Sequence, residues 1–301
     1  SPSVTWILDL TMSDQAVLTP EAHEQSSEMD VAGEGAHTLH AAIPQNQDIS
    51  MSKTEQDIVE IIGLDEEHHD RAIQRYDHAR RREIVDELLQ GTGRDRVLDL
   101  GCSNGSWYPF LKAQGFAELH GVELSEHRAQ IARQRGYEVF NGHGQDTPFP
   151  DNHFDVVVNQ EVLVHVLQEE DRKAMIAEAK RVLKPGGVYI CSIASAVAQR
   201  RRFFINRITG YGLLSWIKHR LVGRQGREQF QDLTEFTRYW DLKDVRAYLS
   251  SIDLTVVDAV GHTYFFGDLS ANFPAFQRLL DRVLGRRCPD AATVVYLKCT
   301  K

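Results

Sequence analysis

Two acidic residues with a glycine turn between them form the pattern in this sequence that is best suited to binding a ligand. Asp99 lies in the apolar run 97–100, Gly101 and Gly105 follow it, and Glu123 ends the next apolar run. Glycine permits positive φ and a close approach of the backbone to a ligand, and a helix after such a turn offers unpaired N–H groups. An acid at the end of a second parallel strand can accept hydrogen bonds from both ribose hydroxyls. The pattern therefore predicts a site for a nucleoside-containing cofactor.

Three classes of nucleoside cofactor compete for this site: a dinucleotide, a nucleoside triphosphate and S-adenosylmethionine. The turn lacks the Gly-x-Gly-x-x-Gly spacing of a dinucleotide fold, and no Gly-Lys-Ser/Thr sequence is present to hold phosphates. Both phosphate-bearing ligands are therefore disfavoured. Residues 97–107 alone fit a purely structural turn equally well, so the remaining motifs have to decide.

The elements that would position these residues follow from the hydrophobic pattern. From Arg96 onward, short apolar runs alternate with helical periods, which predicts βαβ units and a parallel sheet. Ser125 and Gly136 are suitable caps for one of the helices, and residues 184–187 predict a turn before the fifth strand. Strands are expected at residues 96–100, 119–123, 137–140, 154–158, 188–193, 254–260 and 292–299. Further helices are expected at residues 65–90, 169–183, 241–251 and 272–285.

The N-terminal segment differs in composition from the rest of the chain. The 301 residues carry a formal net charge of −9, but residues 1–52 hold eight acids and no Lys or Arg, which leaves 35 acids against 34 bases elsewhere. Residues 1–51 are therefore expected to be an acidic, disordered tail. One folded domain is expected at 52–301, with N-terminal helices at 52–92 and a cap insertion at 196–235.

The cysteine spacing and the hydropathy of the chain indicate the cellular compartment of the protein. The four cysteines are far apart and form no C-x-x-C pair, which argues against a disulfide framework or a structural zinc site. No run approaches the roughly 18 apolar residues of a membrane span, and the first residues lack the pattern of a signal peptide. A cytoplasmic protein is expected, with peripheral membrane contact as an open alternative.

Four segments in register resemble class I S-adenosylmethionine-dependent methyltransferases, over about residues 65–300. Residues 97–105 resemble the family's glycine-rich first motif, and Glu123 matches its ribose-binding acid. Residues 141–155 resemble the segment before its fourth strand, and residues 181–187 resemble the entry to its fifth. The resemblance implies a three-layer Rossmann-like α/β sandwich with a seven-stranded, mostly parallel sheet whose last strand is antiparallel. Among the members of the family, the sequence most resembles the small-molecule, ubiquinone-pathway-like methyltransferases.

The resemblance also implies which residues bind S-adenosylmethionine. Glu123 would hold the ribose hydroxyls, and His143, which replaces a frequent Asp of the family, would lie beside adenine with Gly144. Gln160 would contact the cofactor largely through its backbone. Tyr76 or one of the arginines 80–82 would close the pocket. The implied cofactor-binding residues are Asp99, Gly101, Ser103, Gly105, Glu123, His143, Gly144, Gln160 and Tyr76.

Residues 161–165 are the candidate catalytic segment. They follow the fourth strand and resemble the Glu-x-x-Glu-His segment of ubiquinone-pathway O-methyltransferases and small-RNA 2′-O-methyltransferases, in which the acids and His can hold a metal. Here Val164 replaces the second acid, so no metal site is predicted, and Glu161 and His165 are only weak candidates for one. His165 is predicted to act as a base or substrate contact.

The acceptor is expected to meet residues 200–227, which contain eight Lys or Arg and no acid among many apolar and aromatic residues. This composition suits an anionic or lipid-linked small molecule and a peripheral membrane contact. The predicted function is methyl transfer to such an acceptor, with oxygen favoured. RNA 2′-O-methylation is an alternative, although nucleic acid is disfavoured because no RNA-binding module accompanies the patch. A catalytically inactive, cofactor-binding regulatory partner is a second alternative.

Overall fold

The computed structural model describes residues 72–209, 237–264 and 274–301, with side chains at 78–204, 237–264 and 275–301. The chain divides into the units Ser1–Ala41 and Ala42–Lys301, and every described residue belongs to the second. The expected tail at 1–51, the helix expected from Ser52 and residues 210–235 of the expected cap lie outside the described residues. The domain boundaries therefore stay predictions.

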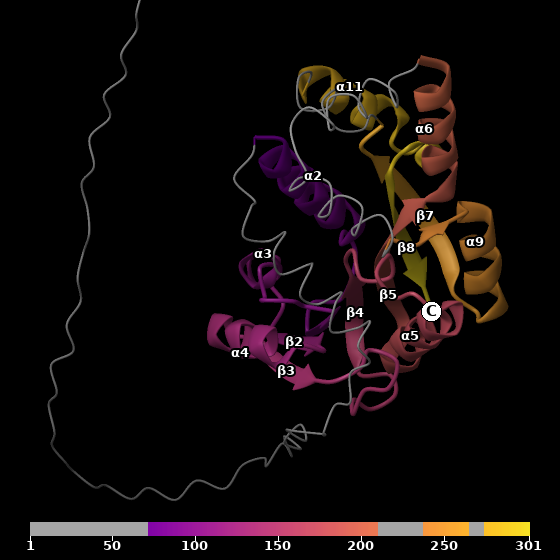
Figure 1. The fold of residues 1–301 in the computed structure, drawn as a ribbon. Helices are drawn as coiled ribbons and strands as arrows, with labels where there is room; N and C mark the ends of the chain where they lie inside the picture. The colour runs from indigo at the N-terminus through magenta and orange to yellow at the C-terminus, as the bar shows by residue number, and fades with distance from the viewer. Residues whose placement is uncertain (1–71, 210–236, 265–273) are drawn as a thin grey trace, which may run out of the picture. The chain divides into compact units, whose positions relative to one another are not determined.

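One sheet runs through the described domain, with its strands in the order β3-β2-β1-β4-β5-β8-β7 (Figure 1). β8 pairs antiparallel with β5 and β7, whereas the other neighbours in that order are parallel. The short β6 pairs with the carboxyl end of β5, so the sheet has eight strands instead of the expected seven. The α/β fold with an antiparallel last strand is confirmed. The strands are β1 (Arg96–Leu100), β2 (Glu118–Glu123), β3 (Glu138–Asn141), β4 (Phe154–Asn159), β5 (Leu183–Ser195), β6 (Tyr239–Trp240), β7 (Thr255–His262) and β8 (Val294–Thr300).

Helices cover both faces of this sheet. The apolar side chains of α2, α3 and α4 share one buried cluster with one face of the strands, and those of α5 and α9 share a second cluster with the other. Each buried aliphatic side chain stabilises the fold by roughly 1.5–3 kcal/mol, so the two clusters fix the sheet between its layers. The helices are α2 (Ala72–Leu88), α3 (Tyr108–Ala113), α4 (Glu126–Arg135), α5 (Glu169–Val182), α6 (Ala196–Thr209), α9 (Leu242–Ser251), α11 (Pro274–Leu284) and the 3-10 helix η1 (Pro289–Ala291).

Local signals explain where α4 begins and ends. The Ser125 side chain accepts a hydrogen bond from the backbone N–H of Arg128 at 3.5 Å, and Gly136 follows the helix with φ of 114°. Both caps were expected from the sequence, because the side-chain oxygen satisfies an unpaired N–H and glycine tolerates the left-handed conformation. α4 is thereby fixed directly after Glu123.

One expectation about local structure was wrong. Residues 184–187 do not form a turn before the strand: β5 begins at Leu183, and the extra residues bulge between the pairs Phe154 with Leu183 and Val156 with Val188. The backbone N–H of Gly186 donates to Lys301 O at 3.0 Å, so pairing with the chain end keeps this segment in the sheet. No described helix is both long enough and apolar enough to cross a membrane.

Candidate functional site

The turn after β1 is tied to the end of β2. The backbone N–H groups of Gly101 and Cys102 both donate to Val122 O at 2.9 Å. Gly101 has φ of 91°, and a Cβ added there would stand 2.3 Å from Val162 Cγ2, so only glycine fits beside the loop that follows β4. Gly105 has φ of 78° and closes the turn by donating to Cys102 O at 2.8 Å. The turn therefore lies between the carboxyl ends of β1, β2 and β4.

Glu123 is held in place by the backbone on both sides of it. Its Oε2 accepts from the N–H of Ser103 at 3.0 Å and its Oε1 from the N–H of Ser125 at 2.9 Å. The residue is 7% exposed. Ser103 adopts φ of 48°, a left-handed conformation that costs about 1–2 kcal/mol without glycine. A carboxylate has about four acceptor positions, which suits the recognition of ribose hydroxyls.

Asp99 lies beneath the turn, 2% exposed, and accepts a hydrogen bond from the Tyr137 hydroxyl to Oδ2 at 2.7 Å. Burial raises the pKa of Asp99 to about 7; the Tyr137 hydrogen bond opposes this shift and the charge of Glu123 adds to it. This pairing could not be predicted from the amino-acid pattern, in which Tyr137 is only an aromatic residue at the start of an expected strand. Asp99 is therefore a buried acid that titrates near neutral pH.

The loop after β3 reaches back to Glu123. The side-chain amide of Asn141 donates to Glu123 O at 2.8 Å and to Leu124 O at 3.0 Å. A Cβ at Gly144 would stand 2.9 Å from Met175 Cε, so this glycine lets the loop pack closely on α5. His143 is partly buried in the same loop. Asn141 is a further site residue that the sequence reasoning did not single out, and it places His143 and Gly144 next to the carboxyl edge.

The residues after β4 carry the polar groups on the other side of the turn. Both polar atoms of the Gln160 side chain are buried and have no hydrogen-bond partner among the residues that the structure describes. Glu161 has φ of 57°, and its backbone N–H donates to Ser192 Oγ at 2.7 Å. Its carboxylate forms an ion pair of 2.9 Å with Arg81 of α2. This loop is therefore fixed to β5 and α2, with a buried amide beside the turn.

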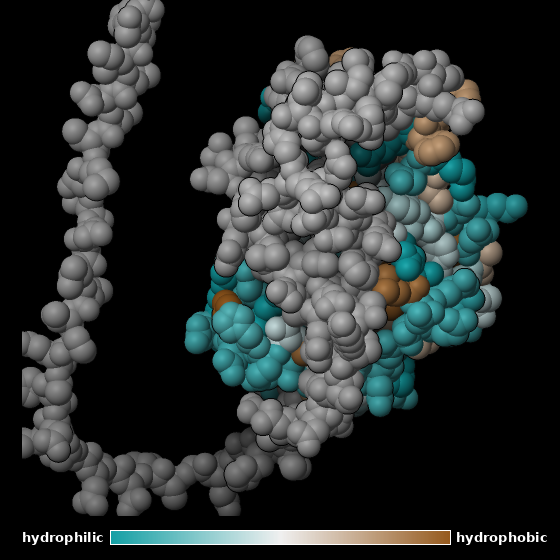
Figure 2. All heavy atoms as spheres, viewed as in Figure 1, coloured by the Kyte–Doolittle hydropathy of each residue, from teal (hydrophilic) through white to brown (hydrophobic). Residues whose placement is uncertain are grey.

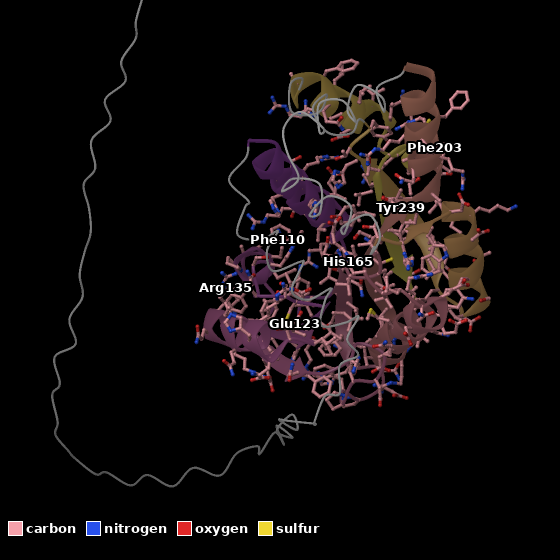
Figure 3. The ribbon with its side chains drawn as sticks, in the orientation of Figure 1. Phe110, Glu123, Arg135, His165, Phe203 and Tyr239 are labelled. Carbon is pink, nitrogen blue, oxygen red and sulfur yellow. The ribbon has the colours of Figure 1, made fainter. Side chains whose placement is uncertain are left out.

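His165 lies in the same loop, partly buried, with its backbone N–H donating to Val162 O at 2.9 Å (Figure 3). Within residues 78–204, 237–264 and 275–301, no three His, Cys, Asp or Glu side chains are placed to hold a metal ion. Tyr76 belongs to α2, but its side chain is outside those described. Among the arginines expected to close the pocket, Arg81 is the one that reaches the loop after β4.

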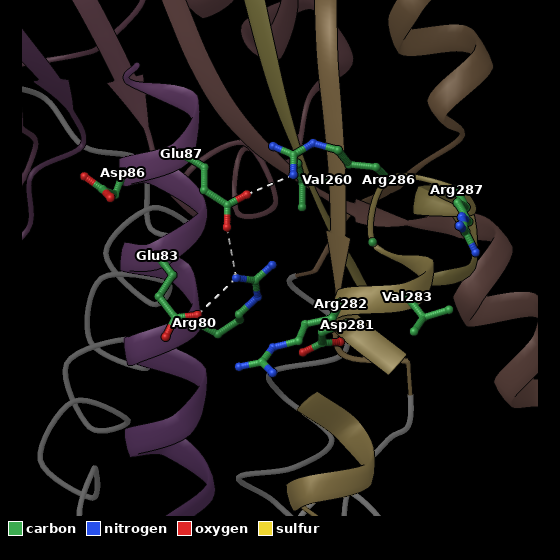
Figure 4. A pocket seen from close by; sticks show the side chains of 11 residues that line it. Arg80, Glu83, Asp86, Glu87, Val260, Asp281, Arg282, Val283, Arg286 and Arg287 are labelled. Atoms are coloured by element: carbon green, nitrogen blue, oxygen red, sulfur yellow. Dashed lines mark hydrogen bonds and ion pairs between the residues drawn. The ribbon is translucent and has the colours of Figure 1, made fainter. Parts of the chain in front are cut away.

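A cavity of about 670 Å³ lies elsewhere, between α2 and the end of α11 (Figure 4). Arg80 pairs there with Glu83 and Glu87, and Arg286 pairs with Glu87. None of the predicted cofactor residues lines this cavity. Its charges neutralise one another across two helices, so it is a structural junction apart from the turn. The lining residues are Arg80, Glu83, Asp86, Glu87, Val260, Asp281, Arg282, Val283, Gly285, Arg286 and Arg287.

Two features of the turn fit a nucleoside cofactor. The Glu123 carboxylate is oriented by backbone N–H groups, and a carboxylate is a suitable acceptor for the hydroxyls of a diol. Within the described part of the chain the buried amide of Gln160 lacks the partner that a buried polar group requires, and a bound ligand would supply one. The turn between them has glycines where a side chain would block approach. These residues are thus suited to bind sugar and base on the carboxyl edge of β1 and β2.

Comparisons with known proteins agree with this geometry. Residues 98–191 match the family model of a methyltransferase domain. The fatty-acid O-methyltransferase of Mycolicibacterium smegmatis is 37% identical over 101 residues, covering 32% of this chain and 35% of that protein. The demethylmenaquinone methyltransferase of Staphylococcus saprophyticus is 32% identical over 118 residues, covering 37% and 49%. The chain thus spans less than half the length of these curated relatives.

The fold also agrees with a solved structure. An S-adenosylmethionine-dependent methyltransferase of Thermotoga maritima, described as a possible histamine N-methyltransferase, superposes with a TM-score of 0.55 at 18% identity. The superposition covers 81% of this chain and 98% of that one. Residues 98–191, from β1 to β5, are thus similar to a methyltransferase domain, and the fold of an S-adenosylmethionine-dependent methyltransferase extends over most of the chain, which supports S-adenosylmethionine as the cofactor.

Proposed function

We propose that this chain transfers a methyl group from S-adenosylmethionine to a small, anionic or lipid-linked acceptor, with an oxygen atom as the favoured nucleophile. The observation that carries the proposal is the Glu123 carboxylate, held by two backbone N–H groups beside the glycine turn. The acceptor class is supported by the basic and aromatic composition of residues 200–227, of which the structure describes the part up to Thr209. The relative named as a fatty-acid O-methyltransferase also favours a lipid-like acceptor.

Within this proposal each group of residues has a separate task. The bound cofactor supplies a methyl group on a sulfonium, which is a strong leaving group. Glu123 and Gln160 fix the orientation of the cofactor, and Asp99 supports the turn from below through its hydrogen bond with Tyr137. Holding acceptor and methyl carbon in line can supply about 7–11 kcal/mol of the barrier in favourable systems. Positioning is therefore the main contribution expected from the chain.

His165 is the proposed general base for a hydroxyl acceptor. As the acceptor oxygen forms its bond to the methyl carbon, the carbon–sulfur bond breaks and its electron pair stays on sulfur. The hydroxyl proton passes to a ring nitrogen of His165, which requires that the imidazole be neutral. A base of this kind contributes about 10²–10⁴-fold to the rate. Replacement of His165 by Ala should lower turnover by that factor and leave cofactor affinity unchanged.

The experiment begins with calorimetry of S-adenosylmethionine and its demethylated product against the purified chain. No binding of either molecule would sink the whole proposal. The next step incubates cell extract with labelled cofactor and the protein, and mass spectrometry identifies the methylated product. Binding of the cofactor without turnover over a broad acceptor panel would favour the catalytically inactive regulatory partner. Transfer of the label to RNA would favour 2′-O-methylation.

The base is then tested with the identified acceptor. His165→Ala is compared with His127→Ala as a control. The His127 side chain is exposed on α4, and His127 is far from His165 in the sequence. Full turnover of the His165 variant would show that its proposed role is wrong, whereas the loss of turnover in both variants would point to a change in the fold.

A further inference from the structure

Ser192 places a hydroxyl in the buried, apolar part of β5. In Figure 2 hydrophilic side chains cover the outer side of α4, whereas Ser192 is 0% exposed and lies between the buried apolar residues Cys191 and Ile193. A buried polar group requires a hydrogen-bond partner. Ser192 Oγ accepts a hydrogen bond from the backbone N–H of Glu161 at 2.7 Å. The hydroxyl therefore contacts the loop after β4, which carries Gln160.

Glu161 has a backbone conformation that residues with a Cβ atom rarely adopt. Its φ of 57° lies in the left-handed region, which is unfavourable for residues other than glycine. Such strain persists where surrounding contacts hold the conformation in place. Two contacts in the described part of the chain do so: Ser192 holds the backbone N–H, and Arg81 of α2 pairs with the carboxylate at 2.9 Å. By strand alternation Ser192 shares the face of Ile190, which α2 covers, so both contacts come from that side of the sheet.

The same hydrogen bond orients the peptide group between Gln160 and Glu161. A trans peptide group is planar with its C=O opposite to its N–H, so the Gln160 carbonyl points away from Ser192. β1 and its glycine turn lie on the other side of β4 from β5. The side-chain amide of Gln160 is buried without a hydrogen-bond partner among the described residues. The placement of both the carbonyl and the amide of Gln160 therefore depends on the backbone of Glu161.

We propose that Ser192 is a positioning residue for the cofactor: its hydroxyl keeps Glu161 in the left-handed conformation in which the loop after β4 presents Gln160 to S-adenosylmethionine. This inference rests on the proposed function, in which Gln160 fixes the orientation of the cofactor. Without the hydroxyl the strained conformation loses one of its contacts, and the loop spends part of its time in relaxed conformations. Cofactor affinity then falls with the fraction of molecules that keep the binding conformation. Because Ser192 is 0% exposed, it acts through the loop and not by touching the cofactor.

The first test is calorimetry of S-adenosylmethionine with the full chain and its Ser192→Ala and Ser195→Ala variants. Ser195 is the matched control because it is also buried on β5, 4% exposed, but its hydroxyl donates to Asp290 O at 2.7 Å and accepts from the N–H of Ala198 at 3.1 Å. Both variants lose a buried hydrogen bond, whereas only Ser192→Ala should weaken cofactor binding, by about two- to tenfold.

The outcomes of this calorimetry separate the inference from the function on which it rests. No binding by the unmodified chain would contradict both. Binding by the unmodified chain with equal affinity in Ser192→Ala would overturn the inference alone. An equal loss of affinity in both serine variants would also overturn it, because the effect would then follow from general destabilisation.

The second test asks whether the hydroxyl acts through the left-handed conformation. Ser192→Ala is introduced into chains that carry Glu161→Gly or Glu161→Ala, which both lack the carboxylate that pairs with Arg81. Glycine adopts the left-handed conformation without strain, so in the glycine chain the loss of the hydroxyl should change cofactor affinity by less than about twofold. In the alanine chain the loss should again be about two- to tenfold. Equal losses in the two chains would overturn the inference.

Circular dichroism checks the fold of every variant. If Ser192→Ala does not fold, Ser192→Cys replaces it in both tests, because a thiol fills a similar space but is only a weak hydrogen-bond acceptor. The same outcomes then support or overturn the inference.

Discussion

Glu123 offers a ribose a carboxyl group whose orientation is set by two backbone N–H groups. Replacement of Glu123 by Gln turns one oxygen into an amide NH₂, which would face the N–H of Ser103 or Ser125. The loss of a charged acceptor is worth about 1.5–3 kcal/mol, so cofactor affinity should fall at least about tenfold in calorimetry. Glu126→Gln, at an exposed position of α4, is the control and should bind as the unmodified chain does. Equal affinity of the Glu123 variant would remove its proposed ribose contact.

Asp99 gives the cofactor-free protein a specific pH dependence. Burial raises its pKa from 3.8 to about 7. Between these two pH values the Asp99 carboxyl is therefore protonated in the folded state and ionised in the unfolded chain. The stabilisation is complete below pH of about 4 and disappears as pH rises to about 7, with an upper limit of roughly 4 kcal/mol. Asp99→Asn, which can still accept from Tyr137, should remove this slope from denaturant unfolding measured across the window. A parallel slope in the variant would mean that another group titrates.

At the scale of elements, the glycine turn has to pack against the loop after β4. Gly101→Ala meets Val162 Cγ2 at 2.3 Å with φ of 91°, whereas Gly115→Ala has φ of 87° and no atom within 4 Å. Both variants should lose about 1–2 kcal/mol of unfolding free energy because alanine is forced into a left-handed conformation. The Gly101 variant should lose about 1–3 kcal/mol more because of the clash. Thermal or denaturant unfolding should show this difference, and the Gly101 variant should also bind cofactor more weakly. Equal destabilisation of the two would mean that the loop moves away freely.

The ion pair of Arg81 and Glu161 joins α2 to the same loop. Their side chains are 19% and 33% exposed, so the coupling should exceed that of a surface pair and reach about 0.5–1.5 kcal/mol in a double-mutant cycle. Arg81→Ala should also weaken cofactor binding several-fold, because the loop carries Gln160. Arg82→Ala, at an exposed position, should change neither quantity. A coupling energy of zero would leave α2 without a role in holding the loop.

In the molecule as a whole, Arg286 connects α2 to the C-terminal half of the sheet. It pairs with Glu87 of α2 at 2.9 Å and with Asp258 of β7 at 3.1 Å, and its side chain is 52% exposed. Exposed pairs contribute little, so Arg286→Ala should lower the free energy of unfolding by less than about 1 kcal/mol, and salt should reduce the effect. Arg287→Ala, exposed and without an ion pair in the described part of the chain, is the control. A loss well above that limit would show that the junction between α2 and α11 stabilises the fold.

S-adenosylmethionine was predicted from the family resemblance, whereas the sheet and most helix positions could be predicted from the amino-acid pattern alone. These depend on short-range signals: apolar runs for the strands, Ser125 and Gly136 as caps of α4, and glycines where the turn needs positive φ. The antiparallel last strand came from the family resemblance, and it is confirmed. Local chemistry was sufficient here because each signal lies within the element that it specifies.

Which distant residues meet depends on how the strands and helices are arranged in the fold. Tyr137 reaches Asp99 and Arg81 reaches Glu161 because the sheet order brings separate segments to one carboxyl edge, and no spacing within the chain encodes that. The bulge at residues 184–187 likewise depends on pairing with Lys301. For α11, the apolar period predicts a helix but not its rotation: the buried hydrogen bonds of Gln277 and Asp281 turn its hydrophobic stripe to solvent. Periodicity defines the faces of an element, whereas the groups it packs against determine which face is buried.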